Sequence, residues 1–190
     1  MATPKILLAS KSPRRQEILT LAGYSFEVIE ISADETFPPH LKGAQIPTFL
    51  SEYKSTHYIP QNKDEIVVTA DTIVWIDGKV LNKPANEREA TEMLELLSGR
   101  VHTVFTGVTL KSSEKICSFH DATEVEFYPL SSEQIKHYIQ NCQPYDKAGS
   151  YGIQDWMGLH GVKRIQGCYY NVMGFPIAKF SREIALFQNN

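Results

Sequence analysis

Strand patterns and helix patterns alternate along the 190-residue chain, and this order limits the fold more than any other feature of the sequence. The apolar run of residues 5–9 (KILLA) predicts a buried strand, and a helix pattern follows it over residues 12–22. Residues 24–31 (YSFEVIEI) alternate between apolar and polar side chains, which indicates a second strand. A helix that begins near Pro47 then leads to another strand at residues 65–70 (EIVVTA). Because strands and helices follow one another in this way, the sequence predicts an α/β fold.

The second half of the chain carries hairpin and antiparallel signals. Asp77 and Gly78 separate two apolar runs and form a dipeptide that favours a two-residue hairpin turn. Residues 101–110 and 122–130 have the pattern of antiparallel strands. Three further helices are expected: one that starts at the cap pair of Asn86 and Glu89, one over residues 131–142 and one over residues 176–187. The glycine-rich residues 149–174 are expected to form loop and strands. Together these patterns predict a mixed sheet with crossovers near both ends of the chain.

The composition is that of a globular chain, with 42% hydrophobic and 22% charged residues, and it excludes disorder and fibrous repeats. The net charge of −3 gives no overall field that favours nucleic acid or an acidic membrane surface, so neither is expected as a partner. Three cysteines are too few for a disulfide framework, which indicates a reducing compartment. The apolar run near residue 5 is shorter than the core of a signal peptide, and no apolar run is long enough to span a membrane, so neither segment is expected. We therefore expect a soluble, cytoplasmic protein that folds as a single domain over residues 1–190.

Four places carry groups suited to chemistry, and the first is the turn that enters the first helix. Lys11, Arg14 and Arg15 surround a helix start predicted at Ser12 and Pro13. Cations at a helix N-terminus are disfavoured by about 0.3–1 kcal/mol each, so a negative group is expected nearby.

The groups at this turn suit a phosphate. Free backbone N–H groups at a helix start bind phosphate, and arginine side chains add paired donors to its oxygens. We predict that the arginines and the hydroxyls of Ser10 and Ser12 bind phosphate groups. The alternative is a solvated charge cluster that Glu17 offsets, but it leaves the conflict with the helix dipole unexplained.

The second place is Asp71 and Thr72, which directly follow the strand predicted at residues 65–70. Ligands tend to bind where strands of an α/β sheet end, although Asp also begins many turns and the signal alone is weak. Asp34 and Glu35 in an early loop could join Asp71 around a divalent ion, because Mg²⁺ takes one or two carboxylates together with substrate phosphates. For Asp34 alone, a turn residue is the favoured interpretation.

The third place is a pair of lysines. Lys54 lies at the edge of an apolar helical stripe, where a phosphate contact and a side chain that merely extends into solvent are equally acceptable. The stripe consists of Phe49, Leu50, Tyr53 and His57. Lys83 precedes Pro84 and is therefore expected on extended backbone beyond the hairpin, a position that says little by itself.

The fourth place is the run of residues 146–154 (DKAGSYGIQ). Gly149 and Gly152 allow a close approach of the backbone to a ligand, and the Gln154 amide can present a donor and an acceptor to a base edge. A simple glycine-bearing connection between strands is the ordinary alternative.

Six motifs occur in one order over almost the whole chain. They are SxSPRR at residues 10–15, Asp34-Glu35-Thr36, the helical Lys54, Ala70-Asp71-Thr72 with Lys83-Pro84, Leu97-Ser98-Gly99 with His102 and Thr106, and Asp146-Lys147-Ala148-Gly149 through Ile153-Gln154 to Gly174. In this combination the chain resembles the Maf family of nucleoside triphosphate pyrophosphatases. Two departures are small: Thr36 stands where serine is usual, and the residues around Lys54 replace the alanines that often flank this lysine.

The resemblance implies a mixed, elongated sheet flanked by helices, with two lobes around an active-site cleft and a fold related to the inosine triphosphate pyrophosphatases. It also implies a homodimer that hydrolyses a nucleoside triphosphate to the monophosphate and diphosphate with a divalent cation, Mg²⁺ or Mn²⁺. By motif position Asp71 would be the general base, and Glu35 with Asp71 would hold the metal. The phosphate-binding residues would be Ser10, Ser12, Arg14, Arg15, Lys54 and Lys83. Within the family Arg14, Thr72 and Gln154 mark the branch that acts on dTTP and UTP.

The expected mechanism is metal-assisted attack of water at the α-phosphorus, with Asp71 as the group that orients and deprotonates the water. Gln154 is expected to pair with a uracil or thymine edge, and modified pyrimidine nucleoside triphosphates are further candidate substrates. One alternative is a nucleotide-binding regulator of cell division without significant catalysis. A nucleic-acid-binding module is the other, and neither the net charge nor the placement of aromatic residues favours it.

Overall fold

The computed structural model describes residues 5–189, and contacts between residues divide the chain into two compact units. Unit 1 contains the described residues up to Asp71, Thr106–Asp121 and the described residues from Gly174 onward. Unit 2 contains Thr72–Phe105 and Ala122–Met173. The single domain predicted over residues 1–190 stays a prediction.

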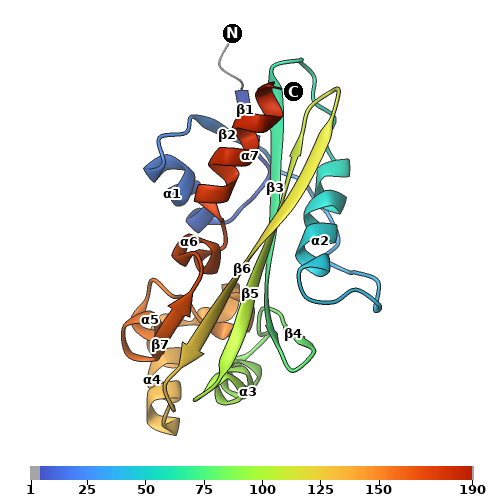
Figure 1. The fold of residues 1–190 in the computed structure, drawn as a ribbon. Coiled ribbons are helices and arrows are strands. Elements are labelled where there is room, and N and C mark those ends of the chain that lie inside the picture. The colour runs from blue at the N-terminus through green and yellow to red at the C-terminus, as the bar shows by residue number, and fades with distance from the viewer. Residues whose placement is uncertain (1–4, 190) are drawn as a thin grey trace. The chain divides into compact units, whose positions relative to one another are not determined.

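Unit 1 begins with the strand and helix order that the sequence predicts (Figure 1). Strand β1 (Lys5–Leu8) pairs in parallel with β2 (Phe26–Val28) and with β3 (Glu65–Ile76), and helix α1 (Pro13–Leu21) connects the first two strands. The strand predicted over residues 24–31 is therefore only three residues long, because its pairing with β1 is limited to the length of that short strand. Parallel pairs joined through helices confirm the predicted α/β fold.

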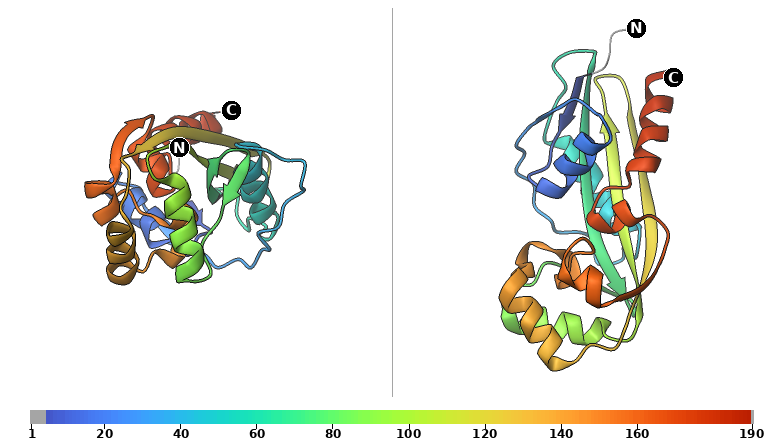
Figure 2. Two further views of the ribbon diagram at one scale, coloured as in Figure 1. Left: turned by 90° about the horizontal axis from the view of Figure 1, so that it is seen from below. Right: turned by 90° about the vertical axis from the view of Figure 1, so that its left-hand side faces the viewer.

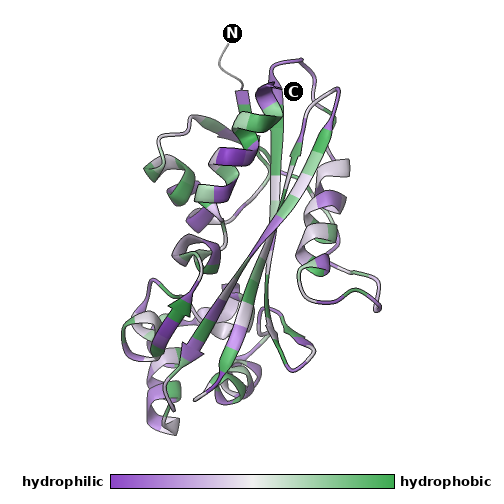
Figure 3. Ribbon diagram, viewed as in Figure 1, coloured by the Kyte–Doolittle hydropathy of each residue, from purple (hydrophilic) through white to green (hydrophobic). Residues whose placement is uncertain are grey.

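Helices cover both sides of β3 in unit 1. Helix α2 (Gln45–Thr56) lies on the opposite side of β3 from α1, as the two views of Figures 1 and 2 agree. The last helix, α7 (Ile177–Asn189), buries Phe180, Ile184 and Phe187, and Figure 3 shows that it contains both apolar and polar residues. The rings of Tyr24 and Phe180 meet edge to face with 5.2 Å between their centroids, so α7 packs beside the end of α1.

The buried face of α2 differs from the predicted stripe. Its buried residues are Ile46, Pro47, Leu50, Ser51 and Ser55. Of the predicted stripe only Leu50 is buried, whereas Tyr53 and His57 are exposed and form a row of aromatic rings with Phe49 on the surface. The helix also begins two residues before Pro47, at a position where a proline costs no helical hydrogen bond.

The close approach of α2 to the neighbouring strand β5 (Val101–Lys111) explains this change of face. A Cβ atom added to Gly107 of β5 would lie 2.3 Å from the carbonyl carbon of Pro47, so the helix backbone lies directly on the glycine. The Ser51 hydroxyl lies 2.9 Å from the Thr109 hydroxyl, and the Thr69 hydroxyl donates to the Ser51 carbonyl oxygen at 2.6 Å. Small and hydrogen-bonded side chains therefore face the sheet where the prediction placed large aromatic ones.

The second half of β3 belongs to unit 2 and forms the predicted hairpin with β4 (Lys79–Leu81). The turn residues Asp77 and Gly78 have φ values of 51° and 76°, which is typical of the twisted two-residue turn that this dipeptide favours. The sequence predicted that Asp71 lies at the exit of a strand, and this prediction is wrong. Strand β3 runs without a break from Glu65 to Ile76, so Asp71 lies in its middle. The apolar residues on both sides of Asp71 belong to one long strand.

The remaining strands complete a seven-stranded mixed sheet. Strand β6 (Ile116–Phe127) follows β5 after a connection of four residues, which is too short for a parallel pair. Strand β7 (Val162–Gln166) pairs with β6 in antiparallel orientation. The strand order is β2-β1-β3-β5-β6-β7, with β4 paired to β3, so the predicted mixed sheet is confirmed.

The helices of unit 2 begin at the predicted caps. Helix α3 (Glu87–Leu97) is capped by the Asn86 side chain, which accepts a hydrogen bond from the Glu89 N–H at 3.0 Å. Helix α4 (Ser132–Cys142) is capped reciprocally by Ser131 and Gln134. The two helices pack against each other.

The segment predicted as loop and strands contains more helix than the sequence indicated. Between α4 and the last helix lie two 3₁₀ turns (Pro144–Asp146 and Ala148–Ser150), α5 (Trp156–His160) and α6 (Tyr169–Met173). These elements are three to five residues long and carry too little periodicity to be recognised as helices. No helix among the described residues combines the length and apolar character that crossing a bilayer requires.

Candidate active site

The turn from β1 into α1 has the backbone expected of a helix start, but the Ser12 side chain does not cap the helix. Ser12 occupies the N-cap position with extended backbone, and Pro13 is the first helical residue. The Ser12 side chain makes no capping hydrogen bond. Instead the buried Ser10 hydroxyl accepts a hydrogen bond from the Ser12 N–H at 3.3 Å. Ser12 is therefore the N-cap residue by position, as predicted, and the Ser10 hydroxyl orders the turn.

Arg15 is fixed by hydrogen bonds to distant parts of unit 1. Its Nε donates to the carbonyl oxygen of Gly174 at 2.9 Å, and its Nη1 donates to the carbonyl oxygen of Ala70 at 2.9 Å and to the Ser10 hydroxyl at 3.2 Å. Ala70 directly precedes Asp71, so the guanidinium group is held beside the predicted general base.

The electrostatic surroundings of Arg15 contain both signs of charge. Burial lowers the pKa of Arg15, the Asp71 and Glu35 carboxylates raise it, and the neighbouring Arg14 lowers it. An arginine stays protonated under such opposing influences because its ordinary pKa is above 12. Arg15 is therefore a permanent positive charge near two acidic groups.

The other cation of the turn, Lys11, points to a different acid. Its Nζ lies 3.5 Å from a carboxylate oxygen of Glu30, and both side chains are exposed. An exposed pair of this kind contributes little to stability. Lys11 thus belongs to the surface, and the predicted phosphate-binding set does not include it.

Lys54 joins the two predicted catalytic carboxylates. From α2 its Nζ donates to Asp71 Oδ1 at 2.6 Å and to Glu35 Oε1 at 2.9 Å. The side chains of Lys54 and Asp71 are only 13% and 11% exposed, whereas that of Glu35 is 53% exposed. Of the two interpretations of Lys54, extension into solvent is therefore wrong. The ammonium group is part of a charged cluster that we call the Lys54 cluster, made of Lys54, Asp71 and Glu35.

The donor set of the Lys54 cluster fits a divalent cation. Two carboxylate oxygens contact the same ammonium nitrogen, so the two carboxylates lie near each other and could share one cation beside Lys54. Within residues 5–189 no group of three or more histidine, cysteine or acidic side chains gathers in a way that could hold a metal ion. Asp71 and Glu35 would therefore hold such an ion only together with oxygens from elsewhere, which is the usual arrangement for Mg²⁺ on a phosphate substrate.

Asp34 does not belong to the Lys54 cluster. It is exposed, and its Oδ2 accepts a hydrogen bond from the Thr36 hydroxyl two residues later at 3.2 Å. This local contact is of the kind that Asp makes in turns, and the interpretation as a turn residue stays a prediction.

The predicted substrate-contacting residues that follow Asp71 in the sequence lie in unit 2. Thr72 is the next residue of β3, Lys83 is exposed on the segment after β4, and Gln154 is exposed just before α5. The Gly149 N–H donates to the Asn82 carbonyl oxygen at 3.1 Å, so the glycine-bearing run of residues 146–154 lies beside the segment that carries Lys83. Two separate sequence motifs are thus neighbours within this unit.

His102, another residue of the six motifs, is buried in unit 2. Its Nε2 lies 2.7 Å from the Tyr151 hydroxyl, and burial lowers the pKa of His102 to about 3. The imidazole is therefore neutral at physiological pH, and it serves packing and hydrogen bonding in place of carrying charge.

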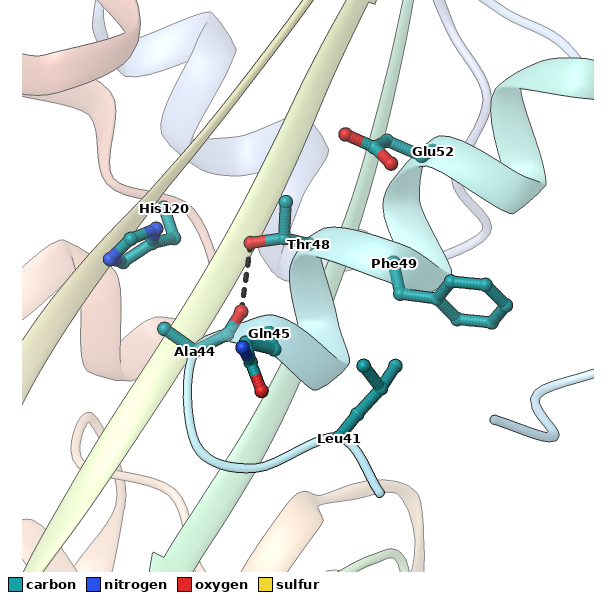
Figure 4. Close-up of a pocket in the computed structure, with 7 residues that line it drawn as sticks. All are labelled: Leu41, Ala44, Gln45, Thr48, Phe49, Glu52 and His120. Carbon is teal, nitrogen blue, oxygen red and sulfur yellow. Dashed lines mark hydrogen bonds between the residues drawn. The ribbon is translucent and has the colours of Figure 1, made fainter. Parts of the chain in front are cut away.

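A hollow of about 380 Å³ lies along α2 in unit 1 (Figure 4). Its lining residues are Leu41, Ala44, Gln45, Thr48, Phe49, Glu52 and His120, and none of them belongs to the predicted site. Figure 4 also shows the hydrogen bond from the Thr48 hydroxyl to the Ala44 carbonyl oxygen, which measures 2.8 Å. The hollow is therefore separate from the residues of the six motifs.

The contributions that sequence reasoning missed come mainly from the backbone. The carbonyl oxygens of Ala70 and Gly174 orient Arg15, and neither residue type signals that role. A second missed feature is the contact of Tyr138 with Asp155 and Gly152, which flank Gln154. Nothing in the sequence indicates what the hydroxyl group of the buried Tyr138 contacts.

Comparisons with known proteins agree with these motifs over nearly the whole chain. The family model described as Maf-like protein matches residues 5–187. A dTTP/UTP pyrophosphatase of Bacteroides thetaiotaomicron is 48% identical over 182 residues, which cover 95% of this chain and 94% of that protein. The dTTP/UTP pyrophosphatase of Cytophaga hutchinsonii is 46% identical over 94% of this chain and 82% of its own length. One from Bacillus cereus is also 46% identical, over 96% of this chain and 95% of its own.

Two solved structures of Ham1 proteins also align with the chain, at low sequence identity. The protein from Coxiella burnetii is 16% identical with a TM-score of 0.44, over 65% of this chain and 73% of its own. The Staphylococcus aureus protein is 12% identical with a TM-score of 0.45, over 65% and 71% of the two chains. The family model and the curated relatives, by contrast, extend over almost the full length, and by this measure the chain belongs to the Maf-like protein family.

Proposed function

We propose that this chain hydrolyses dTTP and UTP to the nucleoside monophosphate and diphosphate. As a family member whose curated relatives carry the name dTTP/UTP pyrophosphatase, it is a nucleoside triphosphate pyrophosphatase, a hydrolase of nucleotide metabolism. The structural observation that carries the proposal is the Lys54 cluster with Arg15 fixed beside it. It combines a base, a second carboxylate and two cations in one place.

The proposed reaction needs positioning and charge neutralisation more than covalent chemistry. In phosphoryl and nucleotidyl transfer the rate comes mainly from holding the reacting groups in line and from stabilising charge on the phosphate oxygens. Asp71 is the proposed general base, which takes a proton from the attacking water. The Lys54 Nζ donates to Asp71 Oδ1 at 2.6 Å, and this contact directs the carboxylate.

Lys54 and the arginines of the β1–α1 turn are the proposed contacts of the phosphate chain. Among the described residues Lys54 donates two hydrogen bonds, to Asp71 and Glu35, and an ammonium group has three donors. The third donor is proposed for a phosphate oxygen. Arg14, Arg15 and the N–H groups at the start of α1 add donors of the kind that bind phosphate. Lys83, Ser10 and Ser12 complete the proposed set.

A divalent cation, Mg²⁺ or Mn²⁺, is the proposed cofactor, held by Asp71 and Glu35. When bound, such an ion would lower the pKa of a coordinated water and neutralise charge on the phosphates. The protein side of this arrangement is the pair of carboxylates, one buried on β3 and one exposed in the loop before α2. Lys54 would hold both of them in place before the substrate enters.

Base selection is proposed for Arg14, Thr72 and Gln154. An amide side chain can donate to one polar atom of uracil or thymine and accept from another, and a mismatched partner leaves a polar group unpaired. Modified pyrimidine nucleotides that keep this edge are proposed as further substrates.

The cytoplasm is the proposed location, and a homodimer is the proposed assembly. Cys117, Cys142 and Cys168 are free thiols in the structure, in keeping with a reducing compartment. The homodimer follows from the family resemblance alone, and light scattering on the purified protein tests it directly.

A diphosphate-release assay tests the proposed activity. The purified chain is given dTTP, UTP, CTP, ATP and GTP in turn, with Mg²⁺ or with Mn²⁺. We expect release from dTTP and UTP well above the others, and Asp71→Asn should abolish turnover while metal-dependent nucleotide binding persists. Asp34→Asn, which removes an exposed carboxylate outside the cluster, is the matched control and should stay active. Binding without hydrolysis by the wild type would favour the nucleotide-binding regulator, and retained hydrolysis in Asp71→Asn would remove this residue from the base role.

A further inference from the structure

Gln154 is an exposed side chain that directly follows three buried residues. Tyr151, Gly152 and Ile153 precede it and are all buried, while Gln154 itself reaches the surface of unit 2. An amide that distinguishes bases by hydrogen bonds must be held to within a fraction of an ångström, since small displacements cost much of the selectivity. The contacts that fix residues on both sides of Gln154 therefore decide how well it can serve this purpose.

One buried hydroxyl group holds both sides of Gln154. Tyr138 of α4 is fully buried, and its hydroxyl accepts a hydrogen bond from the Gly152 N–H at 3.1 Å. The same hydroxyl donates to Asp155 Oδ2 at 2.9 Å. The residue two positions before Gln154 and the residue directly after it are thus tied to a single atom of a neighbouring helix.

Asp155 extends this connection into α5. While its Oδ2 accepts from Tyr138, its Oδ1 accepts from the Met157 N–H at 3.1 Å and so caps the helix. A carboxylate at this position is favoured by the helix dipole and satisfies one of the unpaired N–H groups of the first turn. Both oxygens of Asp155 are therefore engaged in ordering the segment that bears Gln154.

The residues of this network pack closely against one another. A Cβ atom added to Gly152 would lie 2.5 Å from Asp155 Oδ2, so the carboxylate rests directly over the glycine. The Trp156 ring stacks on the Tyr138 ring, with 6.1 Å between centroids and 26° between planes. Burial and the charge of Asp155 both raise the pKa of Tyr138, so its hydroxyl stays protonated and donates to the carboxylate.

We propose that Tyr138 and Asp155 are positioning residues that hold Gln154 in place for pyrimidine base selection. The inference rests on the proposed function, because Gln154 selects a base only if the chain hydrolyses pyrimidine nucleotides. It goes further in assigning selectivity to residues that need not touch the substrate. A defect in the network should then change the choice between substrates, and not only the overall rate.

The test compares kcat/KM for UTP and CTP in the purified full chain. Tyr138→Phe keeps the buried ring and removes only the hydroxyl, and we expect the preference for UTP over CTP to fall about tenfold, as loss of a hydrogen bond to a charged group permits. Gln154→Ala should lower the same ratio. Because Tyr138 acts through Gln154, the double variant should show the ratio of Gln154→Ala alone. Tyr128→Phe, which alters an exposed tyrosine of the same unit, is the control and should keep the wild-type ratio.

Asp155→Asn provides the second variant, since asparagine can still accept the capping hydrogen bond from Met157. It should retain more of the UTP preference than Asp155→Ala, and it serves in place of Tyr138→Phe if that variant fails to fold. Unchanged UTP-to-CTP ratios in these variants, or a further drop in the double variant, would overturn the positioning role while leaving the proposed function intact. A wild type that hydrolyses neither nucleotide would instead remove the proposed function, and this inference with it.

Discussion

Replacement of Lys54 by methionine tests how much Lys54 contributes to the stability of the fold. Methionine keeps most of the length of the side chain but removes the charge, so Asp71 would remain in the middle of β3 with its principal counter-ion gone. The Lys54 Nζ and Asp71 Oδ1 are 2.6 Å apart, and both side chains are nearly nine-tenths buried. Glu35 is half exposed, so water can replace much of its contact with Lys54.

The expected size follows from burial. Breaking a buried ion pair by removing one partner costs about 3–5 kcal/mol, because the other charge is left without compensation. The remaining exposure of the two side chains and the positive field of Arg15 favour the lower end, about 3 kcal/mol. For a chain of this length, about 3 kcal/mol corresponds to a decrease in Tm of about 6–12 °C.

Urea denaturation followed by circular dichroism measures this change in the free energy of unfolding. Lys63→Met is the matched control, since Lys63 pairs with Glu114 at 3.3 Å but both side chains are exposed, and its cost should be below about 1 kcal/mol. The double variant Lys54→Met/Asp71→Asn removes both charges of the buried pair and should recover at least half of the lost stability. An Lys54→Met variant as stable as the control, or a double variant with simply additive losses, would refute the view that Lys54 compensates Asp71.

Three further results are expected. Gly107→Ala should destabilise the chain by about 2–3 kcal/mol in the same urea assay, because the added Cβ would meet the Pro47 carbonyl group at 2.3 Å and α2 would have to move; a change below about 0.5 kcal/mol would contradict this close contact. Burial lowers the pKa of His102 from 6.5 to about 3 in the folded chain, so its contribution to stability is complete above pH 6.5 and is lost as the pH falls toward 3. Between pH 7 and pH 5 the free energy of unfolding of the wild type should therefore fall by about 2 kcal/mol more than that of His102→Phe, and equal decreases would refute this. Removal of divalent cations by a chelator should abolish hydrolysis, and Glu35→Gln should raise the Mg²⁺ concentration for half-maximal rate about tenfold, whereas an unchanged metal requirement would exclude Glu35 as a ligand.

Elements governed by local chemistry could be predicted from the sequence. The caps of α3 and α4 and the Asp77-Gly78 turn depend on side chains and backbone angles within a few residues, and they occur where the patterns predicted them. The folded chain keeps these local preferences. The order of the elements and the mixed sheet could therefore be predicted from the sequence.

Elements governed by distant contacts could not be predicted in the same way. The buried face of α2 depends on Gly107, which lies some sixty positions away in sequence and admits the helix backbone itself. The position of Asp71 within β3 was missed because a charged residue interrupts an apolar pattern, and a strand can continue through it only when a cation such as Lys54 compensates the buried charge. The wrong buried face of α2 and the wrong place of Asp71 have one physical origin. In each case the residue that decides the outcome, Gly107 or Lys54, lies in another element.

The charges of the β1–α1 turn show how far sequence reasoning reaches in the site itself. The cations at the helix start indicate that a negative group lies near them. From the sequence alone, a phosphate ligand cannot be distinguished from acidic groups and carbonyl oxygens of the protein itself. In the structure Lys11 pairs with Glu30, while Arg15 donates to two carbonyl oxygens and lies in the field of Asp71 and Glu35. The protein thus supplies part of the negative charge that the helix start demands, and crowded cations alone are a weak argument for a phosphate. The stronger argument is that Lys54 holds the buried carboxylate of Asp71 and the exposed one of Glu35 together, at a cost in desolvation that a purely structural pair seldom repays.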